Sequence, residues 1–180
     1  AVLKDLAIPN YRWDGFRYDY KQPIEKQLEA LAPRVEALAR LNQKYGLCAI
    51  YHTHSGVGRV GASFWDVHGL LRKHDPAHVA VNYDVGHATI EGGLGGWINS
   101  FHLMGRHLGG IALKDFAWKR DDKGKWRAAW TPVGEGMVNF PEFFKMMAAR
   151  RDFKGPVQLH FEYPLGGADT GKTSITIPDQ

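Results

Sequence analysis

Residues 47–83 read LCAIYHTHSGVGRVGASFWDVHGLLRKHDPAHVAVNY and contain one complete structural unit. Two short runs rich in β-branched and aromatic side chains, residues 47–53 and 78–83, flank a glycine-rich turn and a stretch with helical periodicity. That stretch predicts a helix over residues 63–73, which ends before Pro76. Strand, helix and strand with a crossover of this length are typical of a parallel βα unit.

Further elements are expected on both sides of this unit. The apolar spacing of residues 24–45 predicts an amphipathic helix that ends at Gly46. In the 63–73 helix, Ser63 is expected as the N-cap and Asp66 as the partner that completes a capping box. The remaining elements alternate in the same way, with strands at residues 8–13, 110–114 and 157–163 and helices at residues 94–108 and 141–151.

The segment 116–136 follows the 110–114 strand and lacks a helical or strand period. It carries three tryptophans, Trp118, Trp126 and Trp130, and the charged run KRDDKGK at residues 119–125. We expect an irregular surface excursion, a kind of loop that is usually functional or flexible.

Composition narrows the class of protein. The chain has 180 residues, a net charge of +4, 44% hydrophobic and 23% charged residues, which is typical of a globular domain. Its single cysteine, Cys48, excludes an internal disulfide and a multi-cysteine zinc site, and its apolar neighbours predict a buried thiol. No apolar run has the length of a membrane helix, and the basic residues are scattered rather than gathered in a stripe. We therefore expect one cytoplasmic domain over residues 1–180, with no membrane or nucleic-acid partner.

Polar and ionisable side chains gather at the carboxyl ends of the four later strands. Residues two apart lie on the same face of a strand, and parallel strands bring their carboxyl ends to one edge. This edge is where βα-barrels and open α/β sheets hold their sites. The four strands present there His52 and His54, then Asn82 and Asp84, then Ala112 and Lys114, and finally Gln158, His160 and Glu162.

Each of these residues also has a purely structural explanation. A histidine near a strand end is commonly hydrogen-bonded within the fold, Asp84 could cap a turn, and Lys114 with Asp115 could form a solvated pair. Glu162 is harder to explain in this way, because an unpaired carboxylate is costly in the apolar and aromatic strand around it. His160 is its candidate partner. A shared site explains the ends of all four strands together.

Several stretches, in this order, resemble the xylose-isomerase-like TIM barrels, the sugar isomerase/epimerase superfamily. The resemblance implies an α/β fold that forms part of a (β/α)8 TIM barrel, roughly its strands 4 to 8 with the intervening helices. The first three βα units and the last helix of the barrel would then be absent from this chain. The stretches are YHTHSG (51–56), WDV..LL (65–71), DPAHVAVNYDVGHATIEGG (75–93), GGIALKDF (109–116), VGEGMVNFPEFF (133–144) and GPVQLHFEYPLGG (155–167).

The resemblance also implies a divalent metal, Mn²⁺, Mg²⁺ or Zn²⁺, held by Glu, Asp, His and Glu at the ends of the last four strands. This sequence keeps Asp84 and Glu162, and His87 follows as in the family's D-x-x-H pattern. It departs at His52, where the family has glutamate, and at Ala112, where the family has histidine. Imidazole and carboxylate both suit such ions, so the candidate metal ligands are His52, Asp84 and Glu162, with His160 as a fourth.

The loss of one glutamate excludes the family's usual two-glutamate proton shuttle. Glu162 remains as a base, with Lys114 or His52 as the acid, and this set predicts proton abstraction next to the carbonyl of a sugar or keto-sugar. Lys114 is also the alternative to a metal, because its ammonium could polarise the substrate oxygen directly. No organic cofactor is expected. The expected substrate contacts are His54, His87, Asn82, His160 and Trp118.

A sugar isomerase or epimerase is the leading hypothesis, because it is the default activity of the superfamily. A keto-sugar lyase or dehydratase is the close alternative, and a catalytically degenerate sugar-binding barrel is an alternative from another class. An abasic-site endonuclease is disfavoured, because positions 52 and 112 weaken the multinuclear zinc site it requires. The expected partner is a small sugar, and association into a homo-oligomer is expected from the resemblance. Aromatic residues near the strand ends offer stacking faces, although most are expected in the core: Tyr51, Trp65, Tyr83, Phe116, Trp118 and Tyr163.

Overall fold

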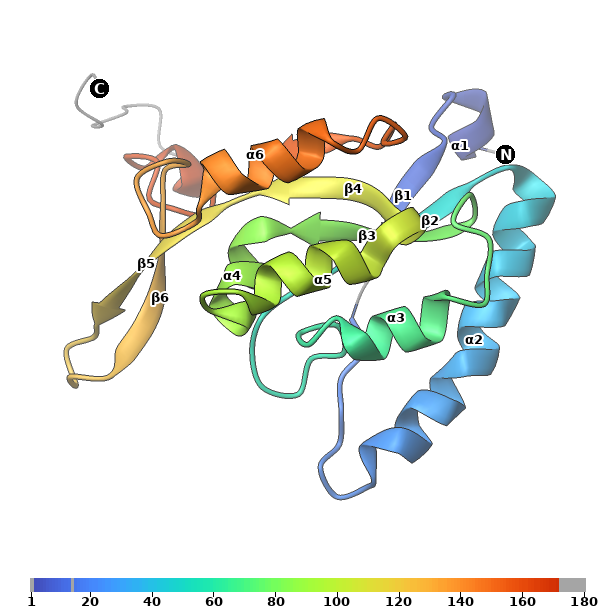
Figure 1. Cartoon of the computed structure of the whole chain (residues 1–180), viewed down its shortest axis with the longest axis horizontal. Helices are drawn as coiled ribbons and strands as arrows, with labels where there is room; N and C mark the ends of the chain where they lie inside the picture. The colour runs from blue at the N-terminus through green and yellow to red at the C-terminus, as the bar shows by residue number, and fades with distance from the viewer. Residues whose placement is uncertain (1, 14, 172–180) are drawn as a thin grey trace.

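The fold is built on a curled, five-stranded parallel sheet. A computed structural model describes residues 2–13 and 15–171, and its strand order is β1-β2-β3-β4-β7. Strands β1 to β4 are labelled in Figure 1. Every neighbouring pair in this sheet is parallel, as the βα pattern predicts. The sheet curls like half a barrel, so the predicted α/β class and partial (β/α)8 architecture are confirmed. The strands are β1 (Asn10–Trp13), β2 (Cys48–His52), β3 (Val79–Asp84), β4 (Leu108–Leu113) and β7 (Val157–Leu159).

Helices cover one face of this sheet and bury its apolar side, so that the core combines residues from strands and from the helices α2 to α6. The longest helix, α2, has the predicted bounds and ends at Gly46, whose left-handed backbone (φ 64°) suits glycine. The helices are α1 (Val2–Asp5), α2 (Ile24–Tyr45), α3 (Trp65–Leu71), α4 (Val85–Gly92), α5 (Gly96–Met104) and α6 (Phe140–Ala148), with short 3-10 turns η1 (Gly105–His107) and η2 (Ala168–Thr170).

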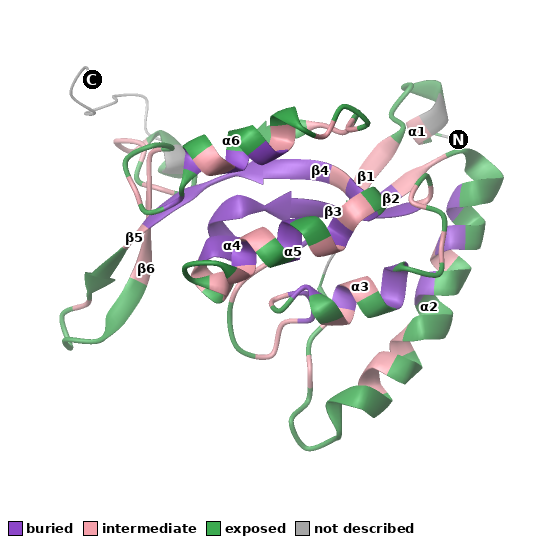
Figure 2. Cartoon of the chain, viewed as in Figure 1, coloured by how far each residue is buried: buried purple, intermediate pink, exposed green. Residues whose placement is uncertain are grey.

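The two faces of the central strand β3 differ in chemistry. Val79, Val81 and Tyr83 join the apolar core beneath the helices, whereas the alternate residues Asn82 and Asp84 face the inner side of the half-barrel. The whole strand is buried, as the continuous purple of β3 in Figure 2 shows. The inner side of the half-barrel is therefore where polar groups of neighbouring strands can meet.

The amino end of α3 differs from the predicted capping box. The N-cap is Phe64, which makes no side-chain capping bond, so the prediction of Ser63 as the cap is wrong. The Asp66 carboxylate instead accepts hydrogen bonds from the Gly61 N–H and from the Tyr18 hydroxyl. Because these partners lie in the preceding loop and in a distant segment, Asp66 ties the glycine-rich loop to the helix rather than closing a box with Ser63.

The segment 116–136 is not the irregular excursion that its composition suggests. Two strands, β5 (Asp115–Arg120) and β6 (Trp126–Thr131), form an antiparallel hairpin that projects from the carboxyl end of β4 (Figure 1). The charged residues cluster at the hairpin tip. They separate two strands whose aromatic residues alternate, and the hairpin is defined by pairing between these strands rather than by a period within either one.

Several other bounds differ from the prediction. The sequence does not predict α4, because this helix follows β3 directly, without a connecting loop that would separate the two elements. The last strand ends at Leu159 instead of residue 163, although the His160 N–H still donates to the Leu113 carbonyl. Cys48 is half-buried, and its thiol lies 3.5 Å from the Pro76 carbonyl oxygen. Among the residues described, none of the helices combines the length and the hydropathy that crossing a bilayer demands.

Candidate active site at the strand ends

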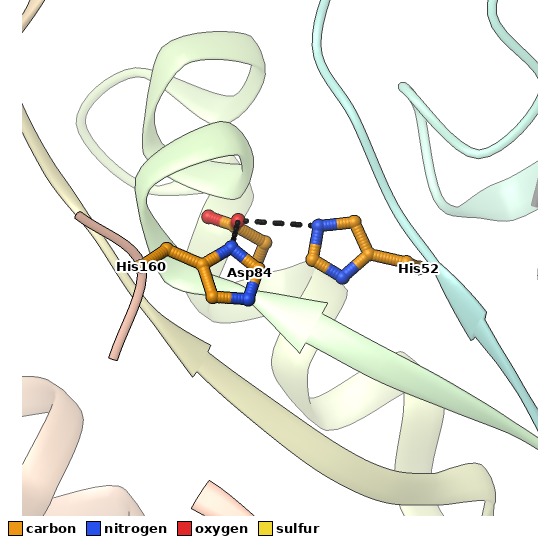
Figure 3. Close-up of side chains that lie close together, drawn as sticks. All are labelled: His52, Asp84 and His160. Carbon is orange, nitrogen blue, oxygen red and sulfur yellow. Dashed lines mark ion pairs between the residues drawn. The ribbon is translucent and has the colours of Figure 1, made fainter. Parts of the chain in front are cut away.

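The ends of the strands bring ionisable side chains together on the inner side of the half-barrel. Asp84, at the end of β3, is central, because its Oδ2 atom lies 3.5 Å from His52 Nε2 and 3.8 Å from His160 Nδ1 (Figure 3). The Lys114 ammonium lies 3.4 Å from the same oxygen and 2.8 Å from Glu162 Oε1. The structure thus joins residues from four strands in one cluster.

Asp84 is fully buried and still ionised. Its side chain caps α4 by accepting the His87 N–H at 3.0 Å on Oδ1, so the capping role and a role in the site are both present. Burial acts to raise the pKa of this carboxyl, but His52, His87 and Lys114 lower it more, and the pKa falls from 3.8 to about 2. One oxygen therefore serves the helix while the other, Oδ2, remains for the site.

Gly86 permits the close approach of α4 to β4. A Cβ atom at this position would lie 2.8 Å from the carbonyl oxygen of Lys114. Any side chain here would push the first turn of α4 away from β4. The glycine that follows Asp84 therefore sets the distance between this carboxylate and Lys114.

Lys114 is buried among acceptors and an aromatic ring. Besides its two carboxylate partners, its ammonium lies 3.2 Å from His87 Nε2 and 4.5 Å from the centre of the Trp130 ring. Glu162 Oε1 and His87 Nε2 lie within hydrogen-bond distance of the ammonium, Asp84 forms an ion pair with it, and the ring adds a cation–π contact. The alternative explanation, a solvated pair of Lys114 with Asp115, is wrong, because both side chains are buried and Asp115 bonds backbone N–H groups.

His87 is held as a neutral imidazole. Its Nε2 accepts a hydrogen bond from the Lys114 ammonium, so Nδ1 carries the proton and donates to Ser55 Oγ at 2.8 Å. Burial lowers the pKa of His87 to about 3; Asp84 opposes this shift and Lys114 reinforces it. A neutral ring in this position fixes the direction of the Lys114 ammonium.

Glu162 is the member of the cluster that reaches solvent. Its side chain is 49% exposed, whereas that of Lys114 is 1% exposed. Burial acts to raise the pKa of Glu162, but the hydrogen bond and the charge of Lys114 lower it more, so the pKa lies below 4.5. The ring of His160, the expected partner of Glu162, lies against Asp84, and burial lowers the pKa of this histidine. Glu162 is thus an ionised carboxylate at the mouth of the cluster.

Three donor atoms are placed to hold a metal ion. His52, Asp84 and His160 each offer one, and the three atoms lie within 4.8 Å of one another. Among the described residues, His52 Nε2 and Asp84 Oδ2 are buried without a hydrogen-bond partner, which is costly unless another group binds them. Ligands at about 2.1 Å from a zinc ion are separated by roughly 3–4 Å. The three residues therefore fit a divalent cation. Glu162, which the sequence also suggested as a ligand, lies outside this set and pairs with Lys114 instead.

Asn82 contacts Nδ1 of the His52 ring, whereas the other ring nitrogen, Nε2, faces Asp84. The Asn82 Nδ2 atom lies 2.7 Å from His52 Nδ1 and 3.3 Å from Gln158 Oε1, while the Asn82 Oδ1 is buried with no hydrogen-bond partner in the described part of the chain. A half-turn of the amide would let Oδ1 accept a hydrogen bond from the His52 Nδ1–H group and leave Nε2 free to bind a metal. The position of Asn82 thus suits a group that orients His52.

The remaining predicted contacts lie around the cluster. The half-buried His54 has its Nε2 3.2 Å from Arg12 Nη2 and its ring 4.5 Å from that of His52. Trp118 lies farther out, on the hairpin. The sequence does not single out Trp130 as a site residue, because its place over Lys114 follows from the hairpin pairing. Of the aromatic residues considered for stacking, Tyr51, Tyr83 and Phe116 are buried in the core, whereas Trp65 and Trp118 are exposed.

A parallel half-barrel with ionisable groups at the carboxyl ends of its strands is the architecture of a βα-barrel enzyme site. The sequence profile of the xylose isomerase-like TIM barrel family matches residues 3–175. The chain belongs to this family, and the resemblance seen in the sequence is confirmed.

The relatives of the chain are enzymes of this superfamily. It is 29% identical over 144 residues to inosose dehydratase 2 of Bacillus cereus, a match that covers 73% of this chain and 46% of the relative. The chain thus spans about half the length of the curated relatives it matches.

Solved structures share the fold. A xylose isomerase domain protein from Planctomyces limnophilus superposes with a TM-score of 0.69 at 17% identity, over 93% of this chain and 56% of the other. A D-allulose 3-epimerase from Methylomonas sp., in complex with D-allulose, gives 0.65 at 15% identity, over 88% and 51%. At these identities the likeness concerns the fold alone.

Proposed function

We propose that this chain carries the proton-transfer groups of an enzyme that removes water from a keto-sugar or a related polyhydroxy ketone. The observation that carries the proposal is the pair of Glu162 and Lys114, a half-exposed carboxylate 2.8 Å from a buried ammonium. Elimination next to a carbonyl needs one base for the carbon-bound proton and one acid for the departing hydroxide. This pair supplies both, and the similarity to an inosose dehydratase supports the same reaction class.

In the proposed reaction, Glu162 takes the proton from the carbon next to the carbonyl, and the electron pair of that bond moves toward the carbonyl oxygen as an enolate. When the carbonyl re-forms, this electron pair makes a carbon–carbon double bond and expels the hydroxyl group of the next carbon. The hydroxyl takes a proton from Lys114 and leaves as water. Glu162 then returns its proton to Lys114 across their contact, which restores both groups.

The groups around this pair prepare it for the reaction. His87 accepts a hydrogen bond from Lys114 and orients the ammonium, while Asp84 forms an ion pair with it. A divalent cation held by His52, Asp84 and His160 would supply a Lewis acid for the substrate oxygen when bound. In this proposal His52 serves as a ligand rather than as the acid, and Lys114 is the alternative polarising group.

Isomerisation or epimerisation, the leading hypothesis from the sequence, is the second candidate. It begins with the same abstraction by Glu162 but returns a proton to carbon, which for epimerisation needs a second group on the opposite face of the substrate. His54 favours this candidate, because it is half-buried after β2, with its ring 4.5 Å from His52 and 5.1 Å from His87.

The test is incubation of the full-length protein with polyhydroxy ketones in D₂O, followed by proton NMR and by the ultraviolet absorbance of an enone. We expect an enone product. We expect Glu162→Gln to lose roughly 10²–10⁴-fold in rate, the usual contribution of a general base. Glu135→Gln is the matched control, because Glu135 is exposed in the loop after β6 and lies outside the cluster.

The possible results separate the hypotheses. Deuterium incorporation without loss of water would identify the isomerase or epimerase. Sugar binding without exchange or elimination would identify a degenerate binding protein. Full activity in Glu162→Gln would contradict the proton-abstraction mechanism in either form.

A further inference from the structure

All the aromatic residues of the β5-β6 hairpin share one of its faces. Directly paired residues lie on the same face of a hairpin, and alternate residues of each strand do so as well. Phe116 is buried at the base, whereas Trp118 and Trp126 are 43% and 60% exposed toward the tip, where Figure 2 shows the hairpin in green. The pairs on this aromatic face are Phe116 with Trp130, Trp118 with Ala128, and Arg120 with Trp126.

The inner end of the aromatic face contacts the cluster of ionisable residues at the strand ends. The centre of the Trp130 ring lies 4.5 Å from Lys114 Nζ and 4.9 Å from the His87 ring. Trp118 is the next large aromatic group outward, since its direct partner is the small Ala128. Successive residues on one face of a strand are roughly 7 Å apart. A ligand bound against the pair of Lys114 and Glu162 would therefore meet Trp118 if it extended outward by one ring.

The hairpin is held in place from its base. The Asp115 carboxylate accepts hydrogen bonds from the backbone N–H groups of Gly134, Gly136 and Val138 at 2.9–3.0 Å. These bonds close the segment after β6 back onto the start of β5. A surface fixed in this way loses little freedom when a ligand binds, so its contacts contribute fully to affinity.

We infer that the aromatic face is a second sugar subsite, and that the substrate is a keto-sugar joined to a further sugar ring that stacks on Trp118 and Trp126. This inference rests on the proposed function. Flat aromatic rings offer apolar surface to the C–H faces of a sugar. Arg120, whose guanidinium lies 5.1 Å from the centre of the Trp126 ring, supplies N–H donors for the hydroxyl groups at the edge. Because Trp130 joins the aromatic face to the cluster, we expect an extension of the substrate, rather than a protein partner, to occupy this face.

The experiment compares two probes by calorimetric titration of the full-length protein: D-fructose, a ketohexose, and lactulose, a keto-disaccharide. Lactulose is expected to bind roughly tenfold more tightly than D-fructose, because a stacked aromatic contact contributes on the order of one factor of ten. Trp118→Ala and Trp126→Ala are each expected to reduce lactulose affinity severalfold, and Trp126→Ala, at the outer position, is expected to leave D-fructose affinity unchanged. The matched control is Trp65→Ala, since Trp65 is 66% exposed but lies on α3.

Equal affinity for the two sugars, or lactulose binding that both hairpin variants retain, would overturn the inference. So would a change in association state by sedimentation in these variants, because a protein surface would then cover the aromatic face. Calorimetry does not depend on turnover, so failure of the proposed function is seen separately. Lactulose binding that depends on Trp118, without exchange or elimination in D₂O, supports the subsite and rejects the chemistry.

Discussion

The two faces of β3 are equally buried but are stabilised in different ways. On the side of the helices, Val81 and Tyr83 pack in a continuous apolar core. On the inner side of the half-barrel, Asn82 and Asp84 depend on hydrogen bonds and ion pairs, and each keeps one buried oxygen without a hydrogen-bond partner among the described residues. An incomplete polar interior is costly for stability. Such a cost is expected where atoms such as Asp84 Oδ2 are reserved for a ligand. We therefore infer that the inner side binds a ligand, whereas the outer side stabilises the fold.

The largest effect on the free energy of unfolding is expected from Lys114→Met, which removes the ion pair with Asp84 on the inner side of the half-barrel. Removal of the ammonium leaves the buried Asp84 carboxylate without its cationic partner, and breaking a buried pair typically costs about 3–5 kcal/mol. Urea unfolding of the full-length protein measures this loss. Lys119→Met, on the exposed part of the hairpin, is the control and should unfold like the wild type. Equal stability of the two variants would show that the inner cluster contributes nothing.

Metal binding should stabilise the inner side of the half-barrel, because the ion would bind the donor atoms of His52, Asp84 and His160. Two imidazoles and one carboxylate suit Zn²⁺ better than Mg²⁺, so Zn²⁺ at 100 times its dissociation constant should stabilise the folded protein by about 2.7 kcal/mol. The chelator-treated protein is titrated with each ion while unfolding is followed. His160→Ala should abolish the Zn²⁺ effect, and His102→Ala, exposed on α5, should not. A Zn²⁺ response that His160→Ala retains would assign the ion to another site.

Val81→Ala tests the outer side of the same strand. Deleting two methyl groups from a fully buried position should cost roughly 2–3 kcal/mol through lost burial and an unfilled cavity. Since Val81 does not line the cluster, metal affinity and turnover per folded molecule should stay unchanged. A marked loss of Zn²⁺ affinity in this variant would mean that the two faces are not independent.

The smallest effect concerns His107, a polar residue at the end of the sheet opposite the cluster. Burial lowers the pKa of His107 below 6.5, and its Nε2 donates to the His74 carbonyl at 3.1 Å. Because the unfolded chain then binds the proton more readily, stability is full above pH 6.5 and falls as the pH drops, by at most about 1.4 kcal/mol per unit. His107→Gln keeps a donor and does not titrate, so it should weaken this dependence in unfolding curves between pH 7 and 5. An unchanged slope would assign the dependence to other groups.

Much of the fold follows from local patterns. The spacing of apolar residues in α2 and the β-branched runs of β2 and β3 depend only on neighbours a few positions away, so they are readable in the sequence. The hairpin is different, because Phe116 and Trp130 are joined by cross-strand pairing rather than by any period within one strand. The early end of β7 is also non-local, since it depends on where pairing with β4 stops.

The sequence by itself determined that polar groups would stand at the carboxyl ends of several parallel strands, because alternation along a strand assigns each side chain to a face. Only the tertiary structure decided their partners. It placed His160 against Asp84, paired Glu162 with Lys114, and set Trp130 over the ammonium. Such contacts depend on the curl of the sheet and on register between segments far apart in the chain, and no local pattern of residues encodes either quantity.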